Sequence, residues 1–328
     1  MKTRRIGSLE VSIVGLGANN FGTDFFGQKC DADDSARIIH AALDAGVTLI
    51  DTAEEYSTTT HIGSGRSEEF IGQALGARRD EVVIASKFSP RLADAPQERG
   101  AKRIVRAVEA SLRRLRTDRI DLYQQHTPDP ETPIEELLEA LDRLVQDGKV
   151  REIGCCNFSG AMIDAAQSAS AARHLRPFAT LQAEYNVLDR PLQEGAIEAC
   201  RAHGMMLLPY FPLASGVLTG KYSQGAPPPR GSRFEADTLV INDYLQRQIS
   251  DARIATVVQL QVYARERGRS ILDLAISWLA SQPFVASVIA GATRPEQIRA
   301  NAAAARWELT PEDFDAIAEI VGRDPTAP

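Results

Sequence analysis

Three short stretches of the sequence place an ionisable side chain at the end of an apolar run. Asp51 follows Leu-Ile in LIDTAEEYS, Lys87 ends VVIASK, and His126 ends LYQQH. The carboxyl end of a buried strand is an unusual place for groups that serve only solubility, and it is where α/β barrels carry their catalytic residues. Tyr56 comes five residues after Asp51, across a short polar turn. We therefore take these four side chains as candidates for one site.

These four residue types suit proton transfer to a carbonyl oxygen. Tyrosine has an unperturbed pKa of about 10, so it acts as an acid or base near neutrality only if its phenolate is favoured. A buried ammonium at Lys87 would favour the phenolate, and Asp51 would keep that lysine charged. His126 would hydrogen-bond the carbonyl and orient it. None of the four can supply a hydride, so a cofactor must provide it.

Each of these residues also has an ordinary structural explanation. Asp51 could cap a turn, His126 could be a hydrogen-bonded interior histidine, and Lys87 could be solvated. The recurrence of such residues at the same point of three strands favours the shared site over three coincidences.

The segments around these residues alternate between short apolar runs and stretches with helical spacing. Such alternation predicts a parallel sheet, and eight units predict a closed (β/α)8 barrel in a single domain over residues 1–328. A small hairpin is expected over 3–12, and a long Gly/Pro-rich segment, 211–251, follows the seventh strand and could bind or cover a ligand. The expected strands begin at SIVGLG and continue at 47–51, 81–87, 119–126, 149–157, 178–186, 205–210 and 284–292, and the expected helices are 34–45, 66–76, 101–115, 133–148, one capped by Ser159, 192–203, 252–267, 270–281, 295–305 and 309–321.

An open dinucleotide-binding fold is the structural alternative. The stretch GLGANN begins like the fingerprint G-x-G-x-x-G, but Asn20 stands where the third glycine belongs. A single partial match of this kind is weak. A two-domain dehydrogenase would also need an early domain boundary, and we see none.

Composition narrows the class of protein. The chain has 328 residues, of which 44% are hydrophobic and 25% charged, with a net charge of -7. This is typical of soluble globular proteins, and no basic stripe indicates a nucleic acid partner. We see neither a secretory signal nor an apolar run of about 18 residues, so we expect a cytoplasmic protein with no membrane segment. The four cysteines have neither disulfide-framework nor zinc spacing, so we expect reduced thiols and no metal site.

As a whole, the sequence resembles the aldo-keto reductase superfamily over nearly its full length. The resemblance implies a (β/α)8 barrel, a nicotinamide cofactor bound without a Rossmann domain, and reversible reduction of aldehydes or ketones to alcohols. It implies a catalytic tetrad of Asp51, Tyr56, Lys87 and His126, with Tyr56 as general acid. The motifs that carry it are, in order, IDTAEEYS, GRSEEFIGQAL, ASKF, DLYQQH, GCCNFS, LQAEYN, PYFPLASGVLTGKY and GATRPEQIRAN.

The same resemblance implies which residues bind the cofactor. Two would lie near the nicotinamide ribose, two would hydrogen-bond the carboxamide beside the strand-five cysteine, and one tyrosine would stack on the nicotinamide ring. The segment from Phe211 to Lys221 would follow the pyrophosphate, where glycine lets the backbone approach the phosphates, and the last motif would hold the adenosine. In that order, with Asp51 added, these residues are Gly17, Asn19, Asn157, Gln182, Cys156, Tyr210, Phe211, Pro212, Leu213, Gly216, Leu218, Gly220, Lys221, Gly291, Ala292, Thr293, Arg294, Gln297 and Asn301. For Gly220 and Lys221 an ordinary turn is the structural alternative.

The chain departs from the usual family pattern at three of these positions. Cys156 replaces a serine, and sulfur is a poorer hydrogen-bond partner for the carboxamide. Gly291 and Gln297 stand where many members have a lysine and an arginine that face the 2′-phosphate. Arg294 is then the expected phosphate partner, because arginine suits phosphate well, and we expect NADPH rather than NADH.

The substrate would be a small carbonyl compound or sugar, but its identity, the preferred direction and the oligomeric state are not predicted. Phe25, Phe26 and the segment 211–251 could form an apolar wall, and His61 could line the substrate mouth; packing and an exposed loop position are the respective alternatives. A functional alternative from another class stays open. Some relatives of this superfamily are auxiliary subunits of potassium channels that bind the cofactor mainly as a redox sensor.

Overall fold

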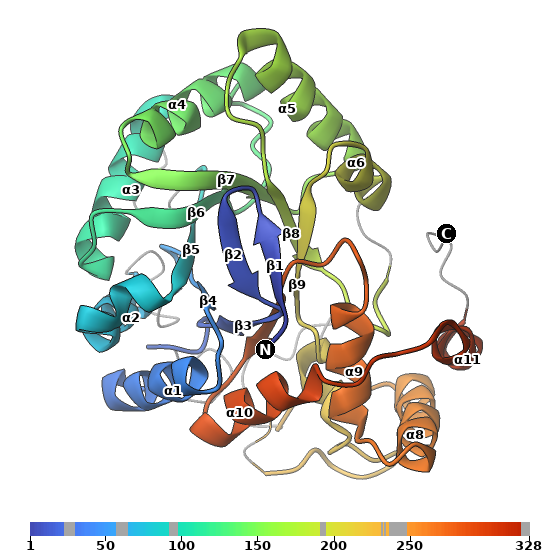
Figure 1. Cartoon of the computed structure of the whole chain (residues 1–328). Helices are drawn as coiled ribbons and strands as arrows, with labels where there is room; N and C mark the ends of the chain where they lie inside the picture. Colours follow the sequence, from blue (N-terminus) through green and yellow to red (C-terminus); the bar gives the residue numbers. More distant parts are fainter. Residues whose placement is uncertain are drawn as a thin grey trace.

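Eight parallel strands surround a common axis (Figure 1). The computed structural model describes residues 1–22, 30–56, 65–91, 98–190, 195–230, 232, 234–235 and 248–322. The strands pair in the order β10-β3-β4-β5-β6-β7-β8-β9. Their bounds are β3 Val14–Gly17, β4 Leu49–Asp51, β5 Val83–Phe88, β6 Ile120–Gln125, β7 Val150–Cys156, β8 Thr180–Glu184, β9 Met206–Tyr210 and β10 Val288–Gly291.

The two edges of the sheet meet just before β10. Leu207 N donates to Phe284 O at 2.7 Å, and Ala286 N donates to Leu207 O at 2.8 Å. These bonds nearly close the sheet into a barrel. The predicted (β/α)8 fold is therefore confirmed, and the open dinucleotide-binding sheet that GLGANN could have indicated is wrong, because the two edges of the sheet are bonded to each other and Gly17 ends one of the barrel strands.

The helices lie outside the strands and largely follow the predicted spans (Figure 1). Some of them begin at a side chain that accepts a backbone N–H group: the Ser159 hydroxyl accepts from Met162 N at 3.3 Å, as predicted, and Asp31 accepts from Asp34 N and starts the first helix two residues earlier than expected. The helices are α1 Ala32–Asp44, α2 Arg66–Leu75, α3 Gly100–Leu115, α4 Ile134–Gln146, α5 Gly160–Arg173, α6 Ala196–Ala202, α8 Asp251–Glu266, α9 Ile271–Ala280, α10 Pro295–Ala304 and α11 Pro311–Val321, with 3-10 turns η1 Gly76–Glu81 and η2 Ala214–Thr219.

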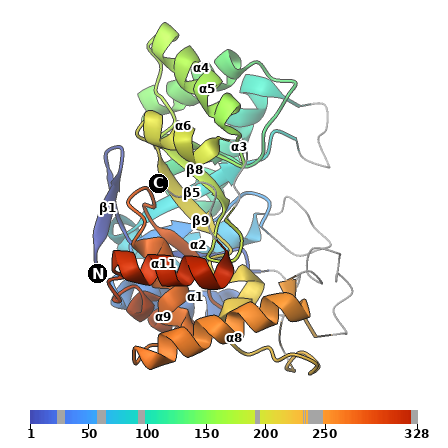
Figure 2. The same ribbon diagram turned by 90° about the vertical axis from the view of Figure 1, so that its right-hand side faces the viewer.

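The N-terminal hairpin covers the amino end of the barrel. Strands β1 Thr3–Ile6 and β2 Leu9–Ser12 pair antiparallel, which confirms the predicted hairpin. Figure 2 shows it at one end of the molecule, and Figure 1 shows it lying across the strands. Its side chains Ile6, Leu9 and Val11 are buried with apolar residues of the barrel interior. The hairpin thus fills this end, and a ligand must enter from the opposite end.

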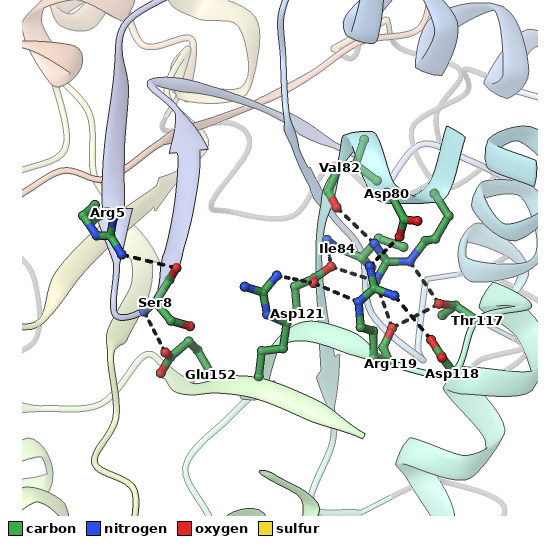
Figure 3. Close-up of polar contacts among 12 residues, drawn as sticks. Arg5, Ser8, Asp80, Val82, Ile84, Thr117, Asp118, Arg119, Asp121 and Glu152 are labelled. Atoms are coloured by element: carbon green, nitrogen blue, oxygen red, sulfur yellow. Dashed lines mark hydrogen bonds and ion pairs between the residues drawn. The ribbon is translucent and has the colours of Figure 1, made fainter. Parts of the chain in front are cut away.

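Polar contacts also connect the elements at the amino end of the barrel (Figure 3). Ser8 N in the hairpin turn donates to Glu152 Oε1 at 2.8 Å. Buried Asp121 on β6 accepts from Ile84 N at 2.9 Å and from Arg79 Nη2 at 2.7 Å. These bonds link the hairpin to β7, and η1 to β5 and β6, so several elements are tied together at the amino end.

The hairpin should contribute directly to stability. Ile6 is fully buried, so Ile6→Ala should lower the free energy of unfolding by about 2–5 kcal/mol in a denaturant titration. Val105→Ala on α3 is the control: Val105 is 44% exposed, and its truncation should change the free energy by no more than about 0.5 kcal/mol. Equal effects of the two changes would contradict the plugging role.

Candidate active site

All eight strand ends contribute to one cavity of about 520 Å³ at the carboxyl end of the barrel. Asp51 ends β4, Lys87 is the penultimate residue of β5, and His126 directly follows β6. Tyr56 lies in the turn after β4 and lines the same cavity. The structure therefore brings the four predicted catalytic residues together, at the end of the barrel that the hairpin leaves open. The other strands contribute Gly17, Cys156, Gln182, Tyr210 and Gly291.

The ammonium of Lys87 connects the site. Its side chain is only 2% exposed, and its Nζ donates to Asp51 Oδ1 at 2.8 Å, to the Thr52 carbonyl at 2.8 Å and to Tyr56 OH at 3.1 Å. A lysine ammonium has three hydrogens to donate, so all are used. Since the Tyr56 oxygen accepts from Lys87, its own hydrogen is left for a ligand.

The pKa values of this pair show how burial and charge compete. Burial alone would lower the pKa of Lys87, but Asp51 and Tyr56 beside it raise that pKa overall, so the lysine stays charged. For Tyr56, burial raises the pKa to about 12 and outweighs the lowering by Lys87. The expectation that the lysine makes the phenol acidic in the free protein is thus wrong. Loss of hydration destabilises the phenolate by more than the single ammonium stabilises it. At neutral pH the phenol keeps its proton.

A buried chain of amides holds the other oxygen of Asp51. Gln182 Nε2 donates to Asp51 Oδ2 at 2.9 Å, and Gln182 Oε1 accepts from Gln124 Nε2 at 3.3 Å and from Cys156 Sγ at 3.4 Å. The chain crosses the barrel to Thr180, whose hydroxyl donates to Gln124 Oε1 at 3.2 Å. This fixes the carboxylate that binds Lys87. It also leaves Gln182 only its second amide hydrogen for a ligand.

His126 lies on the other side of Tyr56. The two rings meet edge to face, with centroids 5.8 Å apart. His126 N donates to Phe88 O at 2.9 Å, and Asn157 Nδ2 donates to His126 O at 3.4 Å. Tyr210 OH in turn donates to Asn157 Oδ1 at 3.0 Å. The residues expected near the nicotinamide are thus held in place by one another.

Most of the expected cofactor residues line the cavity, but three do not. Leu218 is fully buried in the core, Gly220 faces Gln261, and Arg294 is the exposed residue before α10. Phe25, Phe26 and His61 fall outside the described residues, as does part of the segment 211–251. The expected cofactor residues that do line the cavity are Gly17, Asn19, Asp51, Cys156, Asn157, Gln182, Tyr210, Phe211, Pro212, Leu213, Gly216, Lys221, Gly291, Ala292, Thr293, Gln297 and Asn301.

The cavity also includes residues that were not named individually as cofactor residues, although Ser215 and Thr219 lie in the segment expected along the pyrophosphate. They are Asn20, Ser215, Thr219, Leu272, Ile289 and Ala300. Ser215 has a left-handed backbone with φ 57°, and its buried hydroxyl oxygen has no hydrogen-bond partner among the described residues. The sequence feature that could have indicated Ser215 is its position between alanine and glycine in PLASGV.

These features fit the phosphates of a dinucleotide. The unpartnered hydroxyl of Ser215 borders the cavity, and next to it Gly216 has φ 98°. A Cβ at Gly216 would lie 3.7 Å from Lys221 Nζ, which places that cation beside the glycine. Phosphate binding commonly combines a hydroxyl, an approachable backbone and a cation. The cavity volume also falls in the range of cofactor sites.

Two searches of the described residues give negative results. No group of three or more His, Cys, Asp or Glu side chains there could hold a metal ion. None of the helices in those ranges has the length and apolar character to cross a membrane.

Comparison with known proteins agrees with this geometry. The chain is 36% identical to the aldo-keto reductase YhdN of Bacillus subtilis, over 98% of this chain and 94% of that protein. It is 35% identical to a probable voltage-gated potassium channel subunit beta of Arabidopsis thaliana, over 98% and 96%. A crystal structure of an aldo-keto reductase from Klebsiella pneumoniae in complex with NADPH superposes with a TM-score of 0.74 at 28% identity, covering 99% and 96%. The model of the Aldo/keto reductase family matches residues 13–321, and the chain belongs to this family.

Proposed function

We propose that the protein is an NADPH-dependent oxidoreductase that reduces aldehydes or ketones to alcohols, or runs the reverse reaction, with Tyr56 as the proton donor. The observation that carries this proposal is the position of Lys87 Nζ, 2.8 Å from Asp51 Oδ1 and 3.1 Å from Tyr56 OH. This arrangement leaves a phenol proton facing the cavity and a cation beside the phenolate that forms when the proton leaves.

The protein side of the reaction follows from these contacts. Bound NADPH would supply the hydride to the carbonyl carbon. Tyr56 gives its proton to the carbonyl oxygen, and Lys87, held charged by Asp51, stabilises the resulting phenolate. A phenol is a stronger acid than the alcohol that forms, so the transfer is downhill even with the pKa of Tyr56 at about 12. His126 borders the same space and orients the carbonyl.

The residues around the rest of the cavity would hold the cofactor. Asn157 and the free amide hydrogen of Gln182 would bind the carboxamide, and Tyr210 would stack on the nicotinamide. Ser215, Gly216 and Lys221 would bind the pyrophosphate, and the residues from Gly291 to Asn301 the adenosine. The family relative from Klebsiella pneumoniae, solved with NADPH, supports the phosphorylated cofactor.

A second candidate function has a specific observation in its favour. The 35% identity to a potassium channel subunit beta over 98% of the chain supports a cofactor-binding sensor or auxiliary subunit with little turnover. Both candidates use the same cavity, so they differ in rate and assembly. Tight NADPH binding, near-zero turnover on a panel of aldehydes, ketones and sugars, and a stable tetramer would favour the sensor.

The direct test is an absorbance assay with NADPH and an activated aldehyde such as 4-nitrobenzaldehyde. We expect NADPH to be consumed in proportion to the aldehyde added. Titration of protein fluorescence with NADPH and NADH then measures both affinities. Absence of turnover across the whole substrate panel would overturn the reductase proposal.

Tyr56→Phe removes only the proton that the mechanism needs. We expect kcat to fall by about 10²–10⁴ because general acid catalysis is lost, with the Kd for NADPH unchanged within about twofold. The matched control is Tyr263→Phe: Tyr263 OH donates to Asp313 on the outer helices, and turnover should persist. A normal rate in Tyr56→Phe would show that another group is the acid.

Arg294→Ala tests the choice of cofactor. Arg294 is exposed at the amino end of α10, and no ion pair of this residue is found in the described ranges. If it pairs with the 2′-phosphate, its loss should raise the Kd for NADPH about tenfold and leave the Kd for NADH unchanged. Arg299→Ala, an exposed arginine further along α10, should affect neither. An equal effect on both cofactors would exclude a phosphate-specific role.

A further inference from the structure

Three consecutive residues in the turn after β4 point to three different partners. Glu54 is buried, forms an ion pair with Arg103 and accepts from Ser89 N at 2.8 Å. Tyr56 binds Lys87 at 3.1 Å. Between them, Glu55 places its Oε2 3.1 Å from Nδ1 of His126. Because its neighbours on both sides are anchored, Glu55 is held against the imidazole.

The contact between Glu55 and His126 is shielded from water. The two side chains are 29% and 21% exposed, and Nδ1 of His126 is buried with no well-formed hydrogen bond among the described residues, so the Glu55 carboxylate is the charged group that it faces. Burial alone would raise the pKa of the Glu55 carboxyl, but His126 and Ser89 lower that pKa overall. Glu55 is therefore a carboxylate, which only accepts hydrogen bonds. A bare nitrogen lone pair 3.1 Å from a carboxylate oxygen would be repelled by it, so the nitrogen that faces Glu55 is the one that carries a proton.

The cationic side chains near Glu55 are paired with other carboxylates, so Glu55 faces His126. On the neighbouring elements, Lys87 is paired with Asp51 and Arg103 with Glu54. Arg103 acts on Glu55 only through its field, without an ion pair to it in the described ranges. The other groups around His126 are the edge of the Tyr56 ring and the amide of Asn157, which donates to the backbone oxygen of His126. None of these competes for Nδ1.

We propose that Glu55 is a positioning residue that fixes His126 with its proton on Nδ1, so that Nε2 can donate to a substrate carbonyl only when the imidazole carries a second proton. The tautomer is inferred from the contact at 3.1 Å, and its effect on catalysis rests on the proposed function. The tautomer of a neutral histidine is set by the partner of one ring nitrogen, and here that partner accepts. The neutral ring then presents a bare Nε2 to the cavity, which cannot polarise a carbonyl.

Carbonyl reduction should therefore be slower at high pH than at low pH, because a singly protonated ring held by Glu55 has no proton on Nε2. Tyr56 does not obscure this loss, because its pKa of about 12 keeps the phenol protonated through the assay range. Without Glu55, the neutral ring is free to carry its proton on Nε2, and it can then donate at any pH. The pH profile of the reduction should become nearly flat.

The tautomer can be tested without any turnover. The sequence has five histidines, so two-bond proton–nitrogen NMR spectra of histidine-labelled protein are simple, and the signals missing in His126→Gln identify His126. For the neutral ring, we expect the Nδ1–H tautomer in the wild type and the Nε2–H tautomer in Glu55→Leu. Glu10→Leu, an exposed glutamate of the hairpin, should leave the spectrum of His126 unchanged. An Nε2–H tautomer in the wild type, or no change in Glu55→Leu, would overturn the proposal.

The kinetic test uses 4-nitrobenzaldehyde and NADPH between about pH 6 and 9. In the wild type, kcat/KM should fall toward the alkaline end of this range, by up to about tenfold per pH unit, and in Glu55→Leu it should vary by less than about twofold. The Kd for NADPH should be the same in both. If kcat/KM still falls with rising pH in Glu55→Leu, the inference is wrong. If the wild type is inactive but has the Nδ1–H tautomer, only the proposed function is wrong.

Discussion

The site is organised around one buried ammonium. Lys87 is 2% exposed and donates all three of its hydrogens, to a carboxylate, a carbonyl and a phenol. A buried charge without partners would cost several kcal/mol, so the fold must bring Asp51 from β4 against Lys87 from β5. Pairing of these two adjacent parallel strands brings the side chains together, so no additional loop has to be ordered. Tyr56 then enters through the turn that begins at Asp51.

The rest of the barrel makes that geometry rigid. The hairpin fills the amino end with Ile6, Leu9 and Val11, which pack against apolar side chains of the barrel interior. Across the barrel, Gln182, Gln124 and Thr180 fix the second oxygen of Asp51. A chain of buried hydrogen bonds in a low dielectric holds each member in one orientation. Stability at one end and precise placement at the other are thus parts of one structure.

Sequence reasoning succeeded where periodicity or chain position determines the structure. The apolar runs placed Asp51, Lys87 and His126 at the ends of strands, and a parallel barrel must bring such ends together. It failed where orientation matters: Leu218 and Gly220 belong to the expected motif, yet η2 turns one into the core and the other toward Gln261. Ser215 was missed because its left-handed backbone, which a spacing pattern does not encode, is what places its hydroxyl beside the cavity.

The pKa of Tyr56 could not be predicted because it is the balance of two large opposing effects. The sequence identifies the ammonium that favours the phenolate, but only the packing determines how much hydration the phenolate loses. The result, a pKa of about 12, means that the resting phenol keeps its proton although Lys87 lowers the pKa. In the proposed reaction, the ammonium would act most strongly on the charge that develops as the proton leaves. An interaction that strengthens during the reaction is the kind that raises kcat rather than binding alone.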